Sequence, residues 1–161
     1  MKLDQSNITL REANVEDASA LTRLAIRSKA HWGYSDDFMR ACEAELSVLE
    51  ADIKDPTQHI RLAELADELL GFYCLEDLTG DTIELGALFV DPAYIGSGIG
   101  RRLMQAAKQH AVELGANKMT IQGDPHATRF YLAAGAKQTG SKASESIAGR
   151  YLPTFQVDLV D

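Results

Sequence analysis

The sequence predicts a mixed α/β fold in which helices cover a sheet in layers. Segments that alternate polar and apolar residues, as strands do, are interspersed with segments whose apolar residues recur every three to four positions, as in helices. Their order is a strand, two helices, three strands, a helix, a strand, a helix and two strands. Because 161 residues suffice for one sizeable core, we expect residues 1–161 to form a single domain.

The first third of the chain is predicted to hold one strand and two helices. Asn7–Arg11 has the alternation of a short strand, and Asn14 is the N-cap of the helix that follows. A corner at residues 31–34 contains a glycine and two aromatic residues and interrupts the helical pattern. Ser35 then caps a second helix, which we expect to run to about Leu49.

The middle third is predicted to form three strands. Two of them, His59–Leu65 and Leu69–Leu75, flank a turn at residues 66–68, and residues 77–81 form a second turn. The third strand, Thr82–Val90, is the longest. Regular alternation would place Ile83, Leu85, Ala87 and Phe89 on one face and Glu84, Gly86, Leu88 and Val90 on the other, with Gly86 marking a local irregularity.

The last third begins with a glycine-rich turn at residues 95–100, which leads into a helix that ends at Gly115. The remaining predicted elements are a strand at Lys118–Gln122, a helix at His126–Ala134 that follows the cap Asp124 and Pro125, and strands at Ala136–Gly140 and Tyr151–Leu159.

Composition and charge limit the classes of function. The net charge of −8 argues against sequence-independent nucleic-acid binding, which needs a basic surface, and suits a cationic substrate better. No stretch approaches the ~18 apolar residues of a membrane helix, and residues 1–10 lack the pattern of a secretory signal, so we expect a cytoplasmic protein. Cys42 and Cys74 lie in apolar segments without metal-ligand spacing and are expected to be buried free thiols.

The glycine-rich turn predicts a phosphate site. Gly96, Gly98 and Gly100 let the backbone approach an anion closely at the start of a helix. A Rossmann dinucleotide turn requires a further glycine where this chain has Arg101, and the Gly-Lys-Ser/Thr of a P-loop is absent. Spacing alone leaves an ordinary flexible loop with solvated arginines as an equal alternative.

Two stretches resemble the GNAT superfamily of acetyltransferases. The central motif of that family is Gln/Arg-x-x-Gly-x-Gly/Ala after a strand that ends in Val-Asp-Pro, and here Leu88–Pro92 is followed by Ile95–Gly100 and Arg101. Phe130–Ala136 resembles the family's Phe/Leu-Tyr-x-x-x-Gly-Phe/Ala segment. The chain departs from the motifs at Ile95, where the family has Gln or Arg, and at His126, where members often have Asn.

The resemblance implies a mostly antiparallel sheet of six to seven strands flanked by about four helices. It also implies acetyl-CoA as co-substrate, without a metal, with the pantetheine arm pairing to the strand and the diphosphate held by the loop. The cofactor-binding residues it implies are Leu88, Phe89, Val90, Ile95, Gly96, Ser97, Gly98, Ile99, Gly100, Arg101, His126 and Tyr131.

The resemblance suggests two catalytic residues. Glu84 precedes Ile95 by the spacing at which histone-type members place a general base, and the alternative is a solvated or cross-strand paired glutamate. Tyr131 matches the tyrosine whose hydroxyl lies near the CoA sulfur and can protonate the leaving thiolate. Its alternative role is to pack the helix onto the sheet.

The acceptor is expected at the aromatic corner, because the family builds its acceptor pocket partly from the two inserted helices. His31, Trp32 and Tyr34 are the candidate substrate-binding residues, although aromatic residues beside a helix break are more often core. Asp36 and Asp37 would attract a cation or serve as N-terminal helix charges. The expected substrate is a primary amine of a small molecule or peptide, and the resemblance admits a homodimer.

Two other classes of function remain open from the sequence. A non-catalytic acetyl-CoA sensor would keep the coenzyme site without turnover. A nucleotide-phosphate binder unrelated to CoA is the weakest alternative, since both nucleotide fingerprints are missing.

Overall fold

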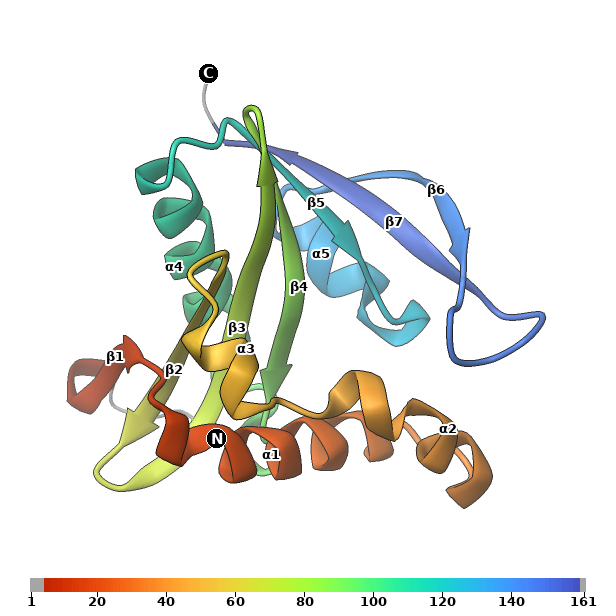
Figure 1. The fold of residues 1–161 in the computed structure, drawn as a ribbon, viewed down its shortest axis with the longest axis horizontal. Coiled ribbons are helices and arrows are strands. Elements are labelled where there is room, and N and C mark those ends of the chain that lie inside the picture. Colours follow the sequence, from red (N-terminus) through yellow and green to blue (C-terminus); the bar gives the residue numbers. More distant parts are fainter. Residues whose placement is uncertain (1–4, 160–161) are drawn as a thin grey trace.

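A single seven-stranded sheet organises the protein (Figure 1), as seen in a computed structural model that describes residues 5–159. The strand order is β1-β2-β3-β4-β5-β7-β6, and all neighbours are antiparallel except β4 and β5, which are parallel. This confirms the predicted fold class. The strands are β1 (Ile8–Glu12), β2 (Gln58–Leu65), β3 (Glu68–Thr79), β4 (Thr82–Val90), β5 (Lys118–Gln122), β6 (Lys137–Ala143) and β7 (Tyr151–Asp158).

Helices cover both faces of the sheet (Figure 1). One hydrophobic cluster joins α1 and α2 to the sheet and includes Leu21, Cys42 and Phe72, whereas a second joins α4 and α5 to the other face and includes Leu103 and Tyr131. The helices are α1 (Ala18–Ala30), α2 (Asp36–Leu46), α3 (Glu50–Lys54), α4 (Ile99–Glu113) and α5 (Thr128–Ala133), with short 3-10 turns η1 (Gln5–Asn7), η2 (Val15–Asp17), η3 (Pro92–Tyr94) and η4 (Pro125–Ala127).

The second predicted helix is shorter than expected. Ser35 caps α2 as predicted, by accepting a hydrogen bond from the Phe38 N–H, but α2 ends at Leu46 instead of Leu49. Val48 is held by Thr22 of α1, whose hydroxyl accepts from the Val48 N–H at 2.8 Å and donates to the Val48 carbonyl at 3.2 Å. These contacts take the backbone of residue 48 out of the helix, and the additional helix α3 begins after it.

The turn predicted at residues 77–81 is also shorter. Strand β3 continues to Thr79, which pairs with Thr82, so only residues 80 and 81 connect the strands. Asp77 has a positive φ of 56°, which interrupts the ladder without ending the strand. Aspartate tolerates this conformation better than most residues.

A β-bulge at Gly86 overturns the predicted faces of β4. Cys74 pairs with Ala87 and Leu75 pairs with Leu85, so Gly86 has no partner on β3 and the predicted irregularity is confirmed. The extra residue reverses the alternation beyond it. Ile83 and Leu85 therefore share the α4 face with Leu88 and Val90, whereas Ala87 and Phe89 pack on the α1–α2 face.

Candidate functional site

A cleft opens where β4 and β5 diverge. The parallel pairing extends from Thr82 opposite Lys118 to Leu85 opposite Ile121, and residues 86–90 of β4 have no partner on β5. The described residues enclose a cleft of about 930 Å³, lined by β4, the start of α4, the end of β5, α5 and the end of α1. This volume and the unpaired strand edge suit an extended ligand that pairs with β4.

The N-terminus of α4 forms one wall of the cleft. Its N-cap is Gly98, which has a φ of 94° and no side chain to accept a hydrogen bond from the first turn. The amides of residues 99–101 open the helix and have no carbonyl acceptor within it, so they and the helix dipole favour an anion. Gly96, Gly98, Gly100 and Arg101 line the cleft at this point.

The other residues of the loop have separate roles. The Ser97 hydroxyl and N–H both donate to the Tyr94 carbonyl, and Ile99 is buried, so both side chains stabilise the loop from inside. Ile95 is 46% exposed and lines the cleft, where a polar side chain would reach an anion. Arg102 instead donates to the Gln5 carbonyl at 2.7 Å, which leaves Arg101 as the cation of this turn on the cleft wall.

Strand β4 forms the floor of the cleft. The predicted cofactor residues Leu88, Phe89 and Val90 all line it. Leu88 and Val90 pack towards α4 and Phe89 towards α1, so each side chain helps to anchor the strand. The main chain of the same residues is left to face the cleft along the unpaired edge.

Tyr131 lies on the wall formed by α5. It is 6% exposed and packs against Phe130 and Phe155, with ring centroids 5.2 and 5.3 Å away. Burial raises the pKa of Tyr131, with a smaller contribution from Asp124. The hydroxyl therefore stays protonated at neutral pH and is able to donate a proton.

Three carboxylates meet where the bulge faces the cleft. Glu84, Glu76 and Asp77 each place an oxygen within 4.8 Å of the other two, and all three line the cleft. Burial and then Asp77 raise the pKa of Glu84, while burial and then Glu84 raise the pKa of Glu76. Sequence reasoning identified Glu84 and missed Glu76. A regular two-residue hairpin turn would place Asp77 opposite Glu84, and only the register shift between Glu76 and Thr79 pairs Glu76 with Glu84.

The aromatic corner divides into two parts. Trp32 lines the cleft and stacks on His126, with ring centroids 5.0 Å apart and planes 5° apart, so the structure brings these two predicted residues together. His31 is exposed beside Trp32 and does not line the cleft. Tyr34 is not among the described residues that line the cleft, and its hydroxyl donates to the Asp124 carboxylate at 2.8 Å.

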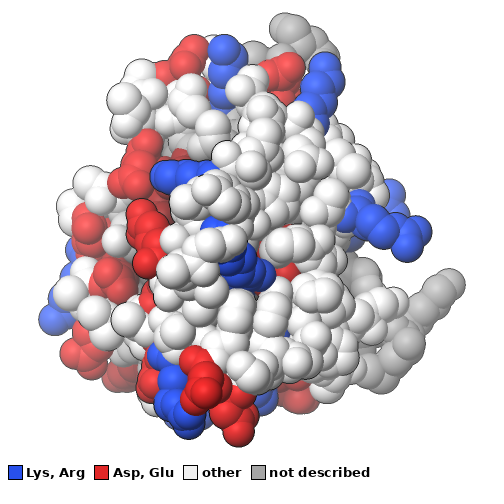
Figure 2. Space-filling model, turned by 90° about the vertical axis from the view of Figure 1, so that its right-hand side faces the viewer, with Lys and Arg blue, Asp and Glu red and all other residues white. Residues whose placement is uncertain are grey.

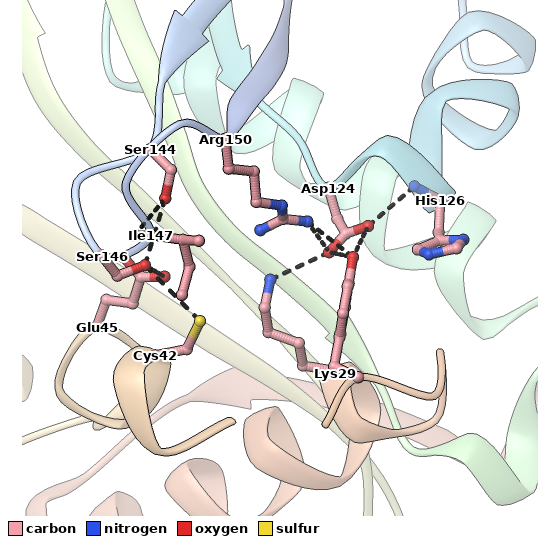
Figure 3. Close-up of polar contacts among 10 residues, drawn as sticks. Lys29, Cys42, Glu45, Asp124, His126, Ser144, Ser146, Ile147 and Arg150 are labelled. Carbon is pink, nitrogen blue, oxygen red and sulfur yellow. Dashed lines mark hydrogen bonds and ion pairs between the residues drawn. The ribbon is translucent and has the colours of Figure 1, made fainter. Parts of the chain in front are cut away.

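A polar network around Asp124 connects the end of α1 to the β6–β7 loop (Figure 3). Asp124 accepts hydrogen bonds from Lys29 and Tyr34, and Arg150 of the β6–β7 loop donates to the Tyr34 hydroxyl at 2.7 Å. Sequence reasoning recognised Asp124 only as a helix cap. Its partners lie far along the chain in both directions, and no local pattern identifies them.

The acidic residues on the cleft wall differ from those expected. Asp36 and Asp37 are exposed in the first turn of α2, away from the cleft, where they act as helix-terminal charges. The carboxylates that do line it are Glu45, Glu76, Asp77, Glu84, Asp124 and Glu145. On the face drawn in Figure 2, acidic side chains gather on the left of the molecule.

Other expectations concern the rest of the chain. Cys42 and Cys74 are buried free thiols, as predicted. Between residues 5 and 159, none of the helices combines the length and the apolar character that crossing a membrane requires.

Comparison with known proteins places this geometry in context. The model of the acetyltransferase (GNAT) family matches residues 23–136, and no curated protein sequence matches the chain. The PaiA N-acetyltransferase of Thermoplasma acidophilum, solved with coenzyme A, is similar in structure, with a TM-score of 0.79 and 20% identity over 94% of this chain and 98% of that one.

Two further structures share the fold. YncA of Salmonella typhimurium, a putative acetyltransferase solved with acetyl-CoA, has a TM-score of 0.67 and 20% identity, with 96% of this chain and 95% of that chain covered. A chimera of the spermidine N-acetyltransferase SpeG from Vibrio cholerae has a TM-score of 0.72 and 19% identity, with coverages of 95% and 96%.

Proposed function

Because the chain belongs to the GNAT family of acetyltransferases, we propose that the cleft between β4 and β5 transfers an acetyl group from acetyl-CoA directly to a primary amine. The observation that carries this proposal is the uncapped N-terminus of α4 beside the unpaired edge of β4. The N-terminus of α4 is suited to the diphosphate of CoA, and the unpaired edge of β4 is suited to the amides of its pantetheine arm.

In this arrangement the coenzyme extends from α4 to the bulge. Its diphosphate accepts hydrogen bonds from the amides of residues 99–101, with Arg101 beside it. The pantetheine amides pair with β4 between Val90 and Gly86. The thioester then reaches the bulge, close to Glu84 and Glu76.

The chemistry requires two proton transfers. The neutral amine attacks the thioester carbonyl carbon, and Glu84 takes the amine proton directly or through water. A main-chain N–H of β4 stabilises the oxyanion. As the carbon–sulfur bond breaks, Tyr131 donates a proton to the departing CoA thiolate.

The cleft wall supports a cationic acceptor on a small molecule or peptide. Glu76 and Asp77 lie within 4.8 Å of Glu84, and Glu45 and Glu145 line the same cleft. Lys142 is the cation that lowers the pKa of Glu84. Trp32 offers an aromatic face on the same cleft. A spermidine N-acetyltransferase among the similar structures has a substrate of this charge.

Thioester consumption with a panel of amines tests the proposal. We expect turnover by the wild type and a kcat lower by about 10²-fold or more in Tyr131→Phe and in Glu84→Gln. Tight acetyl-CoA binding without turnover of any amine would instead favour the sensor. Calorimetry provides the second test, since absence of binding to CoA and acetyl-CoA overturns both readings.

A further inference from the structure

Asp124 lies where four segments of the chain meet at the cleft. It follows β5 directly, beyond the last residue that pairs with β4, and its side chain lines the cleft. Its carboxylate accepts hydrogen bonds from Lys29 of α1 at 3.1 Å and from Tyr34 at 2.8 Å. Arg150 of the β6–β7 loop lies 3.4 Å away, and the His126 N–H donates at 2.9 Å.

The network is shielded from solvent. The side chains of Lys29, Asp124 and Arg150 are 12%, 16% and 16% exposed. Burial opposes ionisation of Asp124, but hydrogen bonds from His126, Tyr34 and Lys29 outweigh it and lower the pKa. Asp124 is thus the ionised partner of two nearly buried cations, each of which would be costly to leave unpaired.

The two cations also pack on the aromatic corner, next to which we expect the acceptor. Arg150 lies over the rings of Tyr34 and Phe38, at 5.2 and 4.8 Å from their centroids, and these rings stack on each other. Lys29 lies over the same two rings, at 5.4 and 5.8 Å. The end of α1, the aromatic corner and the β6–β7 loop therefore depend on one another for position.

The same carboxylate starts the segment that carries Tyr131. Asp124 caps η4 through the His126 N–H, its carbonyl accepts from the Ala127 N–H at 2.8 Å, and α5 begins at the next residue. Tyr131 lies in the middle of this six-residue helix. A shift of the turn at Asp124 would move the tyrosine hydroxyl with it.

From this geometry we infer that Asp124 is a positioning residue for acetyl transfer, which couples the placement of α1, the aromatic corner and the β6–β7 loop to the orientation of Tyr131. The inference rests on the proposed function, because it assigns the leaving-group proton to Tyr131. The proposed diphosphate site lies in the loop before α4 and in its first turn, at residues 96–101, and these residues make none of the hydrogen bonds described for the Asp124 network.

Steady-state kinetics of Asp124→Asn test the inference. We expect kcat to fall about 10- to 100-fold and KM for the amine to rise about tenfold, with KM for acetyl-CoA changed by less than about twofold. The matched control is Asp17→Asn. Asp17 also supports a helix start and pairs with Arg11 at 2.8 Å, with an 18% exposed side chain, but it is remote from the cleft.

A second variant keeps the test valid where Asp124→Asn folds poorly. Lys29→Met combined with Asp124→Asn removes one of the two cations that the single variant leaves unpaired. The double variant should therefore have a kcat at least about threefold higher than Asp124→Asn and unfold at a higher temperature. Independent roles for the two residues would instead give additive losses, which would contradict the coupling.

The outcomes separate the inference from the function beneath it. The positioning role is overturned if Asp124→Asn has the kcat and the amine KM of the wild type, or if its KM for acetyl-CoA rises as much as its KM for the amine. The proposed function stands in either case, provided that Tyr131→Phe is impaired. Wild-type kcat in Tyr131→Phe overturns the role proposed for that hydroxyl, and with it the coupling.

Discussion

Glu84 combines a position at the cleft with an altered acidity. Burial raises its pKa above 4.5, and Asp77 and Glu145 add to the shift. A raised pKa brings a carboxylate closer to the range in which a general base is effective. The same effect makes the base sensitive to the charges beside it.

This sensitivity predicts a pH dependence. A base must be deprotonated, so kcat should fall as the pH decreases through the raised pKa of Glu84, and Asp77→Asn should move that fall to lower pH by removing a negative charge. Asparagine tolerates the positive φ of residue 77. The kcat profiles of wild type, Asp77→Asn and Glu84→Gln provide the measurement. An unshifted profile in Asp77→Asn, or an unchanged acid limb in Glu84→Gln, would exclude Glu84 as the base.

Ile95 supports a prediction about coenzyme affinity. Its exposed side chain lies at the cleft beside the N-terminus of α4, where the family motif has Gln or Arg. Ile95→Arg should bind CoA about tenfold more tightly, because hydrogen bonds to charged groups contribute about 1.5–3 kcal/mol. Calorimetry measures the change. A pantetheine ester without the diphosphate is the control, and an equal gain with it would contradict the assignment of this loop.

At the scale of elements, the β-bulge at Gly86 determines which part of β4 is unpaired and which side chains reach the cleft. It coincides with the end of the β4–β5 pairing and reverses the faces of the rest of β4. A Cβ at residue 86 would lie 2.2 Å from the Glu76 Oε1, so the glycine makes room for that carboxylate. The bulge therefore both opens the strand edge and admits the second glutamate.

Gly86→Ala should displace Glu76 without unfolding the protein. The atom in conflict is the end of a flexible side chain, so we expect a small change in melting temperature together with a kcat lower by about tenfold. Kinetics and thermal unfolding measure the two effects. In the background of Glu76→Ala the conflict is gone, and Gly86→Ala should then have little further effect. A full additional loss there would show that the bulge acts in another way.

At the scale of the whole molecule, a buried histidine links stability to pH. His110 of α4 is 5% exposed, and its Nδ1 lies 2.8 Å from the Tyr73 hydroxyl of β3. Burial, followed by Arg61 and His59, lowers its pKa to about 4. The folded protein therefore contains neutral His110 under conditions in which the unfolded chain is already protonated.

The unfolded state thus binds the additional proton, and stability should decrease as the pH falls from about 6.5 to about 4. Within this window His110 lowers the free energy of unfolding by about 1.4 kcal/mol for each unit by which the pH falls. Above about pH 6.5 the histidine is neutral in both states and has no such effect. Urea unfolding at several pH values measures the slope, and His110→Gln should have a shallower one. Equal slopes for the two proteins would mean that other groups account for the acid sensitivity.

Local patterns in the sequence determined the element order, the caps at Asn14 and Ser35 and the glycine turn before α4. These features depend on residues a few positions apart, whose periodicity and backbone preferences are visible in the chain itself. The family motifs added Glu84 and Tyr131 as catalytic candidates, and these roles stay predictions.

Only the tertiary structure decided how distant segments meet. The contacts of Thr22 with Val48 end α2 before the position to which the apolar pattern of the helix would extend it. The bulge at Gly86 reverses the faces of the β4 side chains beyond it, which regular alternation does not predict. Asp124 joins two cations that are 95 residues before it and 26 residues after it. Such contacts depend on the packing of the folded chain, because burial and charge pairing act through space and leave no periodic pattern in the sequence.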